Sequence, residues 1–438
     1  MKFNKIVSII SLMMMTFFLI ACKGKDDKSI STDNGSNKII VWTFNEDLKY
    51  MAEKYKEIYK DKEVEVVIIE ANDYFIKTNS ALRGRSTVPD ILVGEADWII
   101  PFYEAGYFED LSSSPYNADD FKDKIIDYVY EVGLDKDKTV RALAYQTTPG
   151  GIYYRRDLAK KVWGNDDPEF VGQKFSSLSE IKKTATELNN YGIKIFPDMG
   201  SLRYFSMGEN RDAWVIDNDV TLSENRLNYF DITKGIYDNK EVAFASEWSP
   251  GWYAGMNGSI PYNANGKEEM VDVFGYSLPT WGMIFFRNSG KDMAGNWGIT
   301  TGPNPYIWGG TFIGINKYSK NKKSAWEFLK FVTLNEDTLT WWSKSRGDVV
   351  AYLPVLEKME DEENGYLGGQ KTYKFWTEQA QKVDYSKVTK YDREIEKYFI
   401  QAVGAYQEGK MTKEKAIREF YRNVKTIYPE LNVPNNKQ

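Results

Sequence analysis

The 438-residue sequence contains no histidine and a single cysteine, Cys22. Without histidine the chain cannot form a Ser-His-Asp or Cys-His nucleophile pair, an imidazole general base or a His-ligated zinc site. With one cysteine it cannot form an intrachain disulfide, a CxxC redox centre or a four-cysteine metal site. Most familiar hydrolase and metal centres are therefore excluded, and we predict neither catalytic residues nor a bound metal or cofactor.

Phosphate-binding and calcium-binding motifs are also missing. No GxxxxGK[ST] loop occurs and no GxGxxG follows the first predicted strand, so ATP chemistry must belong to a partner. Residues 135–139 (DKDKT) and 217–221 (DNDVT) imitate the start of a calcium loop. Each lacks the glycine at the sixth place and the glutamate at the twelfth, so both are predicted to be solvated turns.

The composition is that of an acidic globular protein. Hydrophobic residues make up 42% of the chain and aromatic residues 15%, which is typical of chains that fold around a core. The length predicts roughly two to three domains. With 57 basic and 63 acidic residues the net charge is −6, which argues against capture of nucleic acid or of an anionic membrane surface.

The N-terminus has the pattern of an export signal. A basic start, residues 1–5, precedes an uncharged and mainly apolar stretch at 6–20, which is short for a membrane-spanning helix. Leu19-Ile20-Ala21-Cys22 resembles a bacterial lipobox, which implies a cleaved signal peptide (1–21), a lipid on Cys22 and a polar tether over 22–37. The alternative is an uncleaved anchor; both imply export.

Strand and helix patterns alternate after the tether. Residues 38–44, 63–70 and 90–93 are typical of strands, and the segments between them have helical spacing, which predicts a βαβαβ unit. An α/β fold with mainly parallel sheets and helices on both faces is expected, with ligands beyond the carboxyl ends of the strands. Residues 146–150 are predicted to cross between lobes, and Ser177 with Glu180 predicts a capped helix start. Residues 198–312 give no clear pattern.

Several segments, in order, resemble the extracytoplasmic solute-binding proteins of ABC importers, the extracellular solute-binding family 1 group that includes maltose-binding protein. The matching segments are residues 88–92, Phe102, Gly106, Asp110-Leu111, residues 149–158, 309–319, 322–329 and 352–354.

This resemblance implies a two-lobed periplasmic-binding-protein type II fold with a hinged cleft. It implies a first lobe of 38–148 plus 311–345 and a second lobe of 149–310 plus 346–438. It also implies a small-molecule ligand, an ABC permease with a separate ATPase as partner, a monomeric chain and an extracytoplasmic, lipid-anchored location on a bacterial membrane.

Sugars present a CH face that stacks on tryptophan and hydroxyl groups that bind carboxylates and amides. Asp97 and Trp98 directly follow a buried strand, and Asp97 matches the family's hydroxyl-binding acid. The alternative for this pair is an acid at a helix start with a packing tryptophan. Asn45 and Glu46 occupy the family's first ligand loop, and their alternative role is to cap the following helix.

Thr148 lies in the predicted crossover, where family members place a ligand contact. Trp281 matches the family's stacking aromatic residue in the second lobe and lies among residues that break helices. Trp252 and Trp308 lie in similar loop-forming segments, which favours exposed rings. The predicted ligand-binding residues are Asn45, Glu46, Asp97, Trp98, Thr148, Trp252, Trp281 and Trp308.

These features predict a carbohydrate-binding lipoprotein that delivers a sugar or oligosaccharide to an ABC permease. One alternative is an exported glycoside hydrolase, which would also use paired carboxylates and stacking tryptophans. Another keeps the binding fold but changes the ligand to a polyamine, a phosphorylated polyol or a peptide.

Overall fold

The computed structural model describes residues 36–84, 89–96, 98–206, 212–263 and 268–434. The predicted signal peptide, the lipidation site Cys22, nearly all of the tether and the candidate residue Asp97 lie outside the described residues. In the described ranges, no helix combines the length and apolar character needed to cross a membrane.

The first lobe is built on a five-stranded sheet with the order β2-β1-β3-β13-β4. Its strand β1 pairs in parallel with both β2 and β3, with Val41 opposite Val66 on one side and Ile91 on the other. Helices α1 and α2 connect these three strands, so the predicted βαβαβ unit is confirmed. The strands are β1 (Lys38–Thr43), β2 (Glu63–Ile68), β3 (Ile91–Glu95), β4 (Leu143–Ala144) and β13 (Thr311–Ile315).

Strand β13 makes this sheet mixed. It runs antiparallel to β3, with Thr311 opposite Glu95, and antiparallel to β4, with Phe312 opposite Ala144. The chain enters β13 from the second lobe, so this strand starts where β3 ends. Because β4 is antiparallel to β13, it runs in the same direction as β3. Four strands of this sheet thus share the predicted parallel direction, and β13 alone is reversed.

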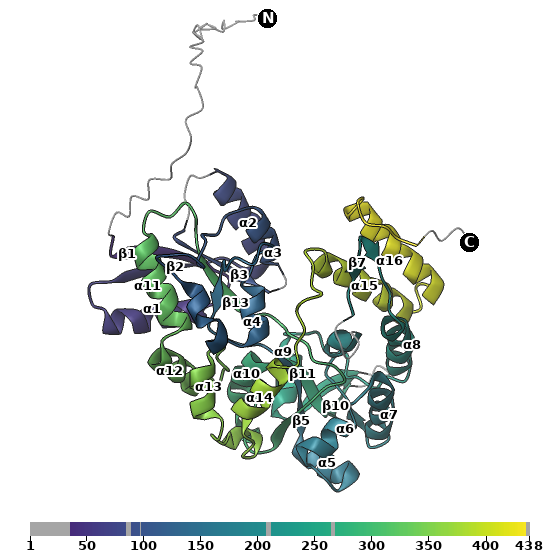
Figure 1. The fold of residues 1–438 in the computed structure, drawn as a ribbon. Coiled ribbons are helices and arrows are strands. Elements are labelled where there is room, and N and C mark those ends of the chain that lie inside the picture. The colour runs from purple at the N-terminus through teal and green to yellow at the C-terminus, as the bar shows by residue number, and fades with distance from the viewer. Residues whose placement is uncertain (1–35, 85–88, 97, 207–211, 264–267, 435–438) are drawn as a thin grey trace, which may run out of the picture. The chain divides into compact units, whose positions relative to one another are not determined.

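Helices cover the sheet of the first lobe (Figure 1). Tyr55 of α1 packs edge-on against Phe328 of α11, at 5.3 Å between ring centroids. Phe75 of α2 stacks on Phe102 of α3 at 5.0 Å. The helices of this lobe are α1 (Asp47–Ile58), α2 (Ala71–Gly84), α3 (Ile100–Glu104), α4 (Asp127–Val132), α11 (Lys322–Thr333) and α12 (Glu336–Arg346).

The second lobe contains smaller sheets, and most of their pairs are antiparallel. Its strand β5 is flanked by β11 and β12, both antiparallel to it, and β10 pairs in parallel with β6 but antiparallel with β9. The strands are β5 (Gly150–Arg155), β6 (Ile193–Lys194), β7 (Val215–Ile216), β8 (Asp219–Val220), β9 (Ser259–Asn263), β10 (Glu268–Val273), β11 (Gly275–Pro279) and β12 (Trp297–Thr300).

This pairing corrects the expected parallel sheet and also positions the site. Strand β5 leaves the crossover at Gly150, whereas β11 returns to it, with Pro279 opposite Gly150. A strand that leaves an edge and a strand that returns to the same edge must be antiparallel. The loop after β11 therefore lies beside the crossover between the lobes.

Helices of the second lobe include one whose start the sequence predicts correctly. The Ser177 hydroxyl accepts a hydrogen bond from the Glu180 amide at 3.1 Å and caps α7. The helices are α5 (Arg156–Trp163), α6 (Pro168–Gln173), α7 (Leu178–Asn189), α8 (Glu224–Asp238), α9 (Pro250–Ala254), α10 (Met283–Ser289), α13 (Leu353–Met359), α14 (Thr372–Ala380), α15 (Asp392–Gln407) and α16 (Lys413–Ile427).

The segments that connect the two lobes pair with one another. Gln146 forms a bridge with Val350, and Pro149 forms one with Ile307. The Thr147 amide donates to the Val349 carbonyl at 2.9 Å. The segments near 147, 308 and 349 thus lie side by side. The lobe boundaries, and with them the crossings between lobes, stay a prediction.

Candidate ligand-binding site

The loop after β1 carries two of the predicted site residues. The Asn45 amide nitrogen donates to the Thr311 hydroxyl at 3.1 Å, and the Asn45 side-chain oxygen accepts from the Asp47 amide at 3.2 Å. Asn45 therefore links this loop to the start of β13. Glu46 is exposed and lies at the N-cap position of α1 without a side-chain capping bond. Contact of either residue with a ligand stays a prediction.

The loop after β3 places Trp98 in the core. Trp98 is 7% exposed, and its ring packs against Phe44 and Tyr74 at 5.6 and 5.5 Å. Its indole N–H donates to Glu95 Oε2 at 3.0 Å. The expectation of a ligand-facing Trp98 is thus corrected, because the aromatic side chains of α2 and α3 cover the ring.

Glu95, the last residue of β3, reaches the second lobe. A Cβ atom added to Gly309 would lie 3.2 Å from Glu95 Oε1 and 3.3 Å from the indole nitrogen of Trp281. Gly309 has a φ of +81°, a conformation that glycine adopts without steric cost. The missing side chain lets a carboxylate of the first lobe approach Trp281, so Glu95 joins the candidate site.

Trp281 and Trp308 form the centre of an aromatic face. Trp281 lies in the 3₁₀ turn Thr280–Gly282 directly after β11, and its N–H donates to the Trp308 carbonyl at 3.0 Å. The two rings meet edge to face, with centroids 4.8 Å apart and planes at 73°. Both side chains are half-buried, so each keeps part of its ring accessible. The sequence-predicted pair is thus brought together, in the loop-like setting that the helix-breaking residues predicted.

Trp248 completes this face, which we define as Trp248, Trp281 and Trp308. Its centroid lies 6.1 Å from that of Trp281 and 5.6 Å from that of Trp308. Its side chain is 40% exposed, and among the tryptophans that the structure describes it is the only one that is exposed rather than buried or half-buried. Beside it lies Trp252, at 4.9 Å.

Trp252 itself is buried, which corrects the expectation of an exposed ring. It is 1% exposed, and its indole N–H donates to Asp198 Oδ2 at 2.7 Å. The Tyr276 hydroxyl donates to its carbonyl at 2.7 Å. Helix α9, which begins after the capping residue Ser249, turns this ring inward. Trp252 therefore supports the aromatic face from beneath rather than forming part of its surface.

An arginine is held against the face by a carboxylate. The Arg203 guanidinium lies 4.4 Å from the Trp308 ring centroid and 4.6 Å from that of Tyr204. Its Nη1 donates to both oxygens of Glu247, at 2.9 and 3.1 Å. Burial disfavours the guanidinium charge, but Tyr204 and Glu247 outweigh burial and raise the pKa of Arg203. Arg203 remains a cation whose charge is balanced by the Glu247 carboxylate.

Thr148 lies in the crossover but contributes little surface. It is buried, its amide donates to the Tyr128 hydroxyl at 2.6 Å, and its carbonyl accepts from the Trp308 amide at 3.2 Å. A Cβ atom on Gly310 would lie 3.5 Å from the Thr148 hydroxyl. These contacts fix the segment that carries Trp308; ligand contact by Thr148 stays a prediction.

The buried carboxylate of Asp348 lies where the lobes meet. Asp348 accepts from the Trp342 indole N–H at 3.1 Å, the Val349 amide at 2.8 Å and the Thr280 hydroxyl at 3.3 Å. Burial raises the pKa of Asp348 to about 7, although these hydrogen bonds oppose the rise. Burial also raises the pKa of nearby Asp47, which the Tyr145 hydroxyl contacts at 2.6 Å. Thr280 directly precedes Trp281, so the interlobe junction and the aromatic face are adjacent.

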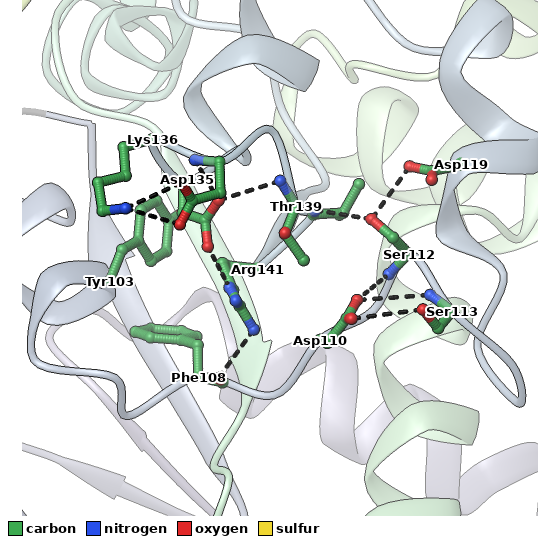
Figure 2. A network of polar contacts seen from close by, with 12 residues as sticks. Tyr103, Phe108, Asp110, Ser112, Ser113, Asp119, Asp135, Lys136, Thr139 and Arg141 are labelled. Carbon is green, nitrogen blue, oxygen red and sulfur yellow. Dashed lines mark hydrogen bonds and ion pairs between the residues drawn. The ribbon is translucent and has the colours of Figure 1, made fainter.

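The two segments that resemble the start of a calcium loop, residues 135–139 and 217–221, contain turns, as predicted. Figure 2 shows Asp135 accepting hydrogen bonds from within its own turn and from Arg141. Its Oδ1 accepts from the Asp137 and Thr139 amides at 2.9 and 3.0 Å. Asp217 and Asn218 take positive φ between β7 and β8. In the ranges that the structure describes, no group of three or more Asp, Glu, Cys or His side chains is placed to hold a metal ion.

The sequence patterns did not identify Trp248, Arg203, Glu247 or Glu95 as site residues. Trp248 lies in Ser246-Glu247-Trp248-Ser249-Pro250, a loop-forming segment like those that contain Trp252 and Trp308. This loop-forming context is the signal that could have identified Trp248. Arg203 and Glu247 are 44 positions apart, and no local pattern connects them.

Comparison with known proteins identifies relatives of this fold. The model of a family described as bacterial extracellular solute-binding protein matches residues 50–366. Among similar solved structures is the ABC transporter associated binding protein from B. animalis subsp. lactis Bl-04 in complex with β-1,6-galactobiose. It has a TM-score of 0.70 and 17% identity, over 91% of this chain and 100% of that one.

Two further structures have the same two-lobed fold. The GacH receptor of Streptomyces glaucescens GLA.O, solved without ligand and with acarbose, has a TM-score of 0.69 and 16% identity, over 90% of this chain and 99% of that one. The sugar-binding protein MalE from Xanthomonas citri has a TM-score of 0.69 and 16% identity, over 89% and 97%. At these identities the likeness establishes the fold, and the predicted periplasmic-binding-protein architecture is confirmed.

Proposed function

The chain belongs to the family of bacterial extracellular solute-binding proteins, and we propose that it captures a carbohydrate outside the cytoplasm and delivers it to an ABC permease. The ligand is a sugar or short oligosaccharide, held between the two lobes. Hinge closure around the ligand would present the loaded form to the permease. ATP hydrolysis belongs to a separate subunit of the importer, because the sequence contains no phosphate-binding loop.

The observation that carries this proposal is the aromatic face of Trp248, Trp281 and Trp308, with Glu95 beside it. Partly exposed indole rings bind the CH face of a sugar, and a carboxylate at their edge accepts hydrogen bonds from its hydroxyl groups. These residues come from loops that follow strands or precede a crossover, where α/β folds place their ligands. Asn45, on the loop after β1, is a proposed hydroxyl partner, and so is Asp97, which lies outside the described residues.

The ring distances argue against a cationic ligand. An aromatic cage holds a cation between separated rings, each within about 6 Å of the charge. The rings of Trp281 and Trp308 are instead in contact, 4.8 Å apart, which leaves no space for a cation between them. A phosphorylated ligand is also disfavoured. The Arg203 guanidinium beside the face already donates to both oxygens of Glu247, so its positive charge is balanced by that carboxylate rather than left for a phosphate.

The known ligands of similar proteins support the carbohydrate class. The B. animalis protein was solved with β-1,6-galactobiose and the Streptomyces receptor with acarbose. The galacto-N-biose-/lacto-N-biose I-binding protein of Bifidobacterium longum was solved with lacto-N-biose.

A thermal-shift screen with mono- and oligosaccharides tests the ligand class. A ligand at about 100 times its Kd should stabilise the native state by roughly 2.7 kcal/mol. Spermidine, glycerol phosphate and a tripeptide serve as the arms for the other ligand classes. Stabilisation by one of these and by no sugar would contradict the proposal.

We also propose that the protein is not an enzyme. The family and the similar structures are binding proteins, whereas a glycoside hydrolase needs two carboxyl groups flanking the scissile bond. Incubation of the purified protein with oligosaccharides tests this proposal. Release of reducing ends at catalytic rates would favour the hydrolase instead.

Closure of the hinge has its own test in small-angle scattering. A saturating sugar should lower the radius of gyration of the monomer without changing its mass, because the lobes approach one another. An unchanged profile in the presence of a sugar that stabilises the protein would contradict closure.

Anchoring through a lipid on Cys22 is a further part of the proposal. The lipobox-like residues 19–22 support it, and a lipid there would hold the exported protein at a bacterial membrane. Cys22→Ala should yield an unlipidated precursor, as measured by metabolic lipid labelling. Equal label on the variant and the wild type would remove the lipoprotein assignment.

A further inference from the structure

The segment between α14 and α15, residues 381–391, is bonded to the first lobe at a buried point. The Tyr385 hydroxyl donates to the Ala96 carbonyl at 2.8 Å. Tyr385 is 8% exposed and Ala96 is 1% exposed, so this bond is shielded from water. The two residues are 289 positions apart, and the bond therefore joins distant parts of the chain at the loop after β3.

The bonded carbonyl belongs to the loop that directs Glu95 toward the aromatic face. Ala96 directly follows Glu95, whose own carbonyl accepts from the Trp98 and Ile99 amides at 3.0 Å each. The Glu95 carboxylate accepts from the Trp98 indole and approaches Trp281, as described above. The position of Ala96 therefore determines where the chain turns away from β3, and with it the direction of the Glu95 side chain.

Local bonds fix the turn that carries Tyr385. The Val388 amide donates to the Tyr385 carbonyl at 3.1 Å. The Thr389 hydroxyl and amide donate to Oδ1 of Asp392, the first residue of α15, at 2.7 and 3.1 Å. Tyr385 is thus connected to α15 through a short, bonded stretch, and its hydroxyl has a firm support from which to hold the loop of the first lobe.

Beside this bond, the segment and the first lobe are separated by a cavity. The cavity has a volume of about 480 Å³, and its walls include Tyr103 and Leu134 on one side and Tyr385 on the other. An ion pair between Lys390 and Glu104, at 3.3 Å, also connects the segment to the first lobe, but both side chains are exposed. Exposed ion pairs contribute little. The buried bond of Tyr385 is therefore the contact whose removal should matter most to the loop.

We propose that Tyr385 is a positioning residue for sugar binding, whose hydroxyl holds the loop after β3 so that the Glu95 carboxylate is directed toward the aromatic face. This inference rests on the proposed function. Without the hydroxyl, the buried Ala96 carbonyl loses its donor, which is costly, and the loop shifts to find another partner. Glu95 shifts with it, and a sugar that needs this carboxylate must restore the loop against that cost.

The test is calorimetric titration of the full chain with β-1,6-galactobiose, maltose and lacto-N-biose. Tyr385→Phe removes the hydroxyl and keeps the ring. It should weaken the sugar that binds the wild type most tightly by about fivefold or more, the cost of burying a carbonyl without its donor.

The matched control is Tyr154→Phe in the second lobe. Tyr154 is also buried, and its hydroxyl donates to the Asp166 carbonyl at 2.6 Å. It lies opposite Gly275, at the end of β5 away from the crossover. This variant loses the same kind of bond, so it should lower the ligand-free melting temperature but leave sugar affinity unchanged.

Amide hydrogen exchange gives a second readout that needs no ligand. The Trp98 and Ile99 amides, which donate to the Glu95 carbonyl, should exchange about fivefold faster in Tyr385→Phe and at the wild-type rate in Tyr154→Phe. A tyrosine that served stability alone would not change this local rate selectively.

Unchanged sugar affinity in Tyr385→Phe would overturn the inference and leave the proposed function standing. Equal losses of affinity in the Tyr385 and Tyr154 variants would also overturn it. So would unchanged exchange of the Trp98 and Ile99 amides, because the loop would then not depend on the hydroxyl. If the wild-type protein binds no member of the sugar panel, the proposed function fails, and this inference fails with it.

Discussion

The loop after β3 in the first lobe and the loop after β11 in the second each succeed a buried strand and each carry a tryptophan. Trp98 is taken up by the core between α2 and α3, whereas Trp281 remains half-buried on the aromatic face. The difference comes from the side chains available around each loop. Phe75, Phe102 and Tyr74 cover Trp98. Trp281 also packs against aromatic rings, those of Trp248, Trp308 and Phe285, and donates to the Trp308 carbonyl, but part of its ring stays accessible.

Similar positions at strand ends can therefore serve either packing or binding. Aromatic side chains from the helices on both sides of the loop, α2 and α3, close over the ring of Trp98. A tight turn that ends in glycine favours a ring with an accessible face. Substitutions in the two regions should separate the two roles.

The largest expected effect is on the stability of the first lobe. Trp98→Ala removes a buried ring and should lower the free energy of unfolding by about 3 to 5 kcal/mol. Trp248→Ala, at an exposed site, should cost less than about 1.5 kcal/mol. Urea unfolding of both variants measures the difference. Equal costs would mean that the two tryptophans do not have the contrasting roles proposed here.

The second prediction concerns the junction between the two regions. Folding raises the pKa of Asp348 to about 7, above the value of about 3.9 in an unfolded chain. Between these values the folded protein binds a proton that the unfolded chain does not. The stabilising contribution is therefore full below about pH 4 and is lost as the pH rises through about 7.

Asp348→Asn removes this titration and should flatten the pH dependence by roughly 1.4 kcal/mol per pH unit in that window. Urea unfolding at about pH 5, 6, 7 and 8 gives the slopes across the window. The raised pKa of Asp198 acts in both proteins and so forms a common background. Identical slopes for the variant and the wild type would show that Asp348 does not titrate there.

The third prediction concerns the aromatic face. Trp281→Ala should weaken sugar binding by about 5- to 150-fold, because it removes an aromatic contact worth roughly 1 to 3 kcal/mol. Its melting temperature should fall less than that of Trp98→Ala. Calorimetric titration beside ligand-free melting distinguishes the outcomes. Unchanged affinity with a collapsed melting temperature would make Trp281 a packing residue.

The smallest effect is expected for the ion pair that supports Trp248. Glu247→Gln should weaken the contact with Arg203 and cost about 1 kcal/mol of stability, since the pair is partly exposed. Sugar affinity should fall by about threefold as the Trp248 segment loosens. Glu53→Gln, which removes an exposed carboxylate of α1, is the control and should change stability by less than about 0.5 kcal/mol. If the Glu247 and Glu53 variants behave alike, the ion pair does not position Trp248.

The sequence was sufficient where structure depends on neighbours along the chain. The βαβαβ unit is predicted by the alternation between strand and helix patterns, and the start of α7 by Ser177 and its partner three residues later. Each of these predictions depends on the spacing of residues that are close along the chain, within about one or two helical turns.

The features that could not be predicted depend on distant contacts. Strands β9 to β12 lie in the region of 198–312, whose sequence has no clear periodicity. Strands β9 and β10 pair with each other, whereas β11 and β12 both pair with β5, far earlier in the chain. The burial of Trp98 depends on Phe75, which is 23 positions earlier, and Arg203 reaches Glu247 only after folding. The left-handed conformation of Trp248 leaves no mark in the sequence, because tryptophan is not a residue that such a position favours.

The close spacing of the aromatic face also has an optical consequence. With centroids 4.8 to 6.1 Å apart, the indole rings of Trp248, Trp281 and Trp308 are near enough for their electronic transitions to couple. A sugar bound to the face as proposed would displace water from these rings and alter their emission and near-ultraviolet circular dichroism. These signals would then report ligand capture in real time, without an attached dye.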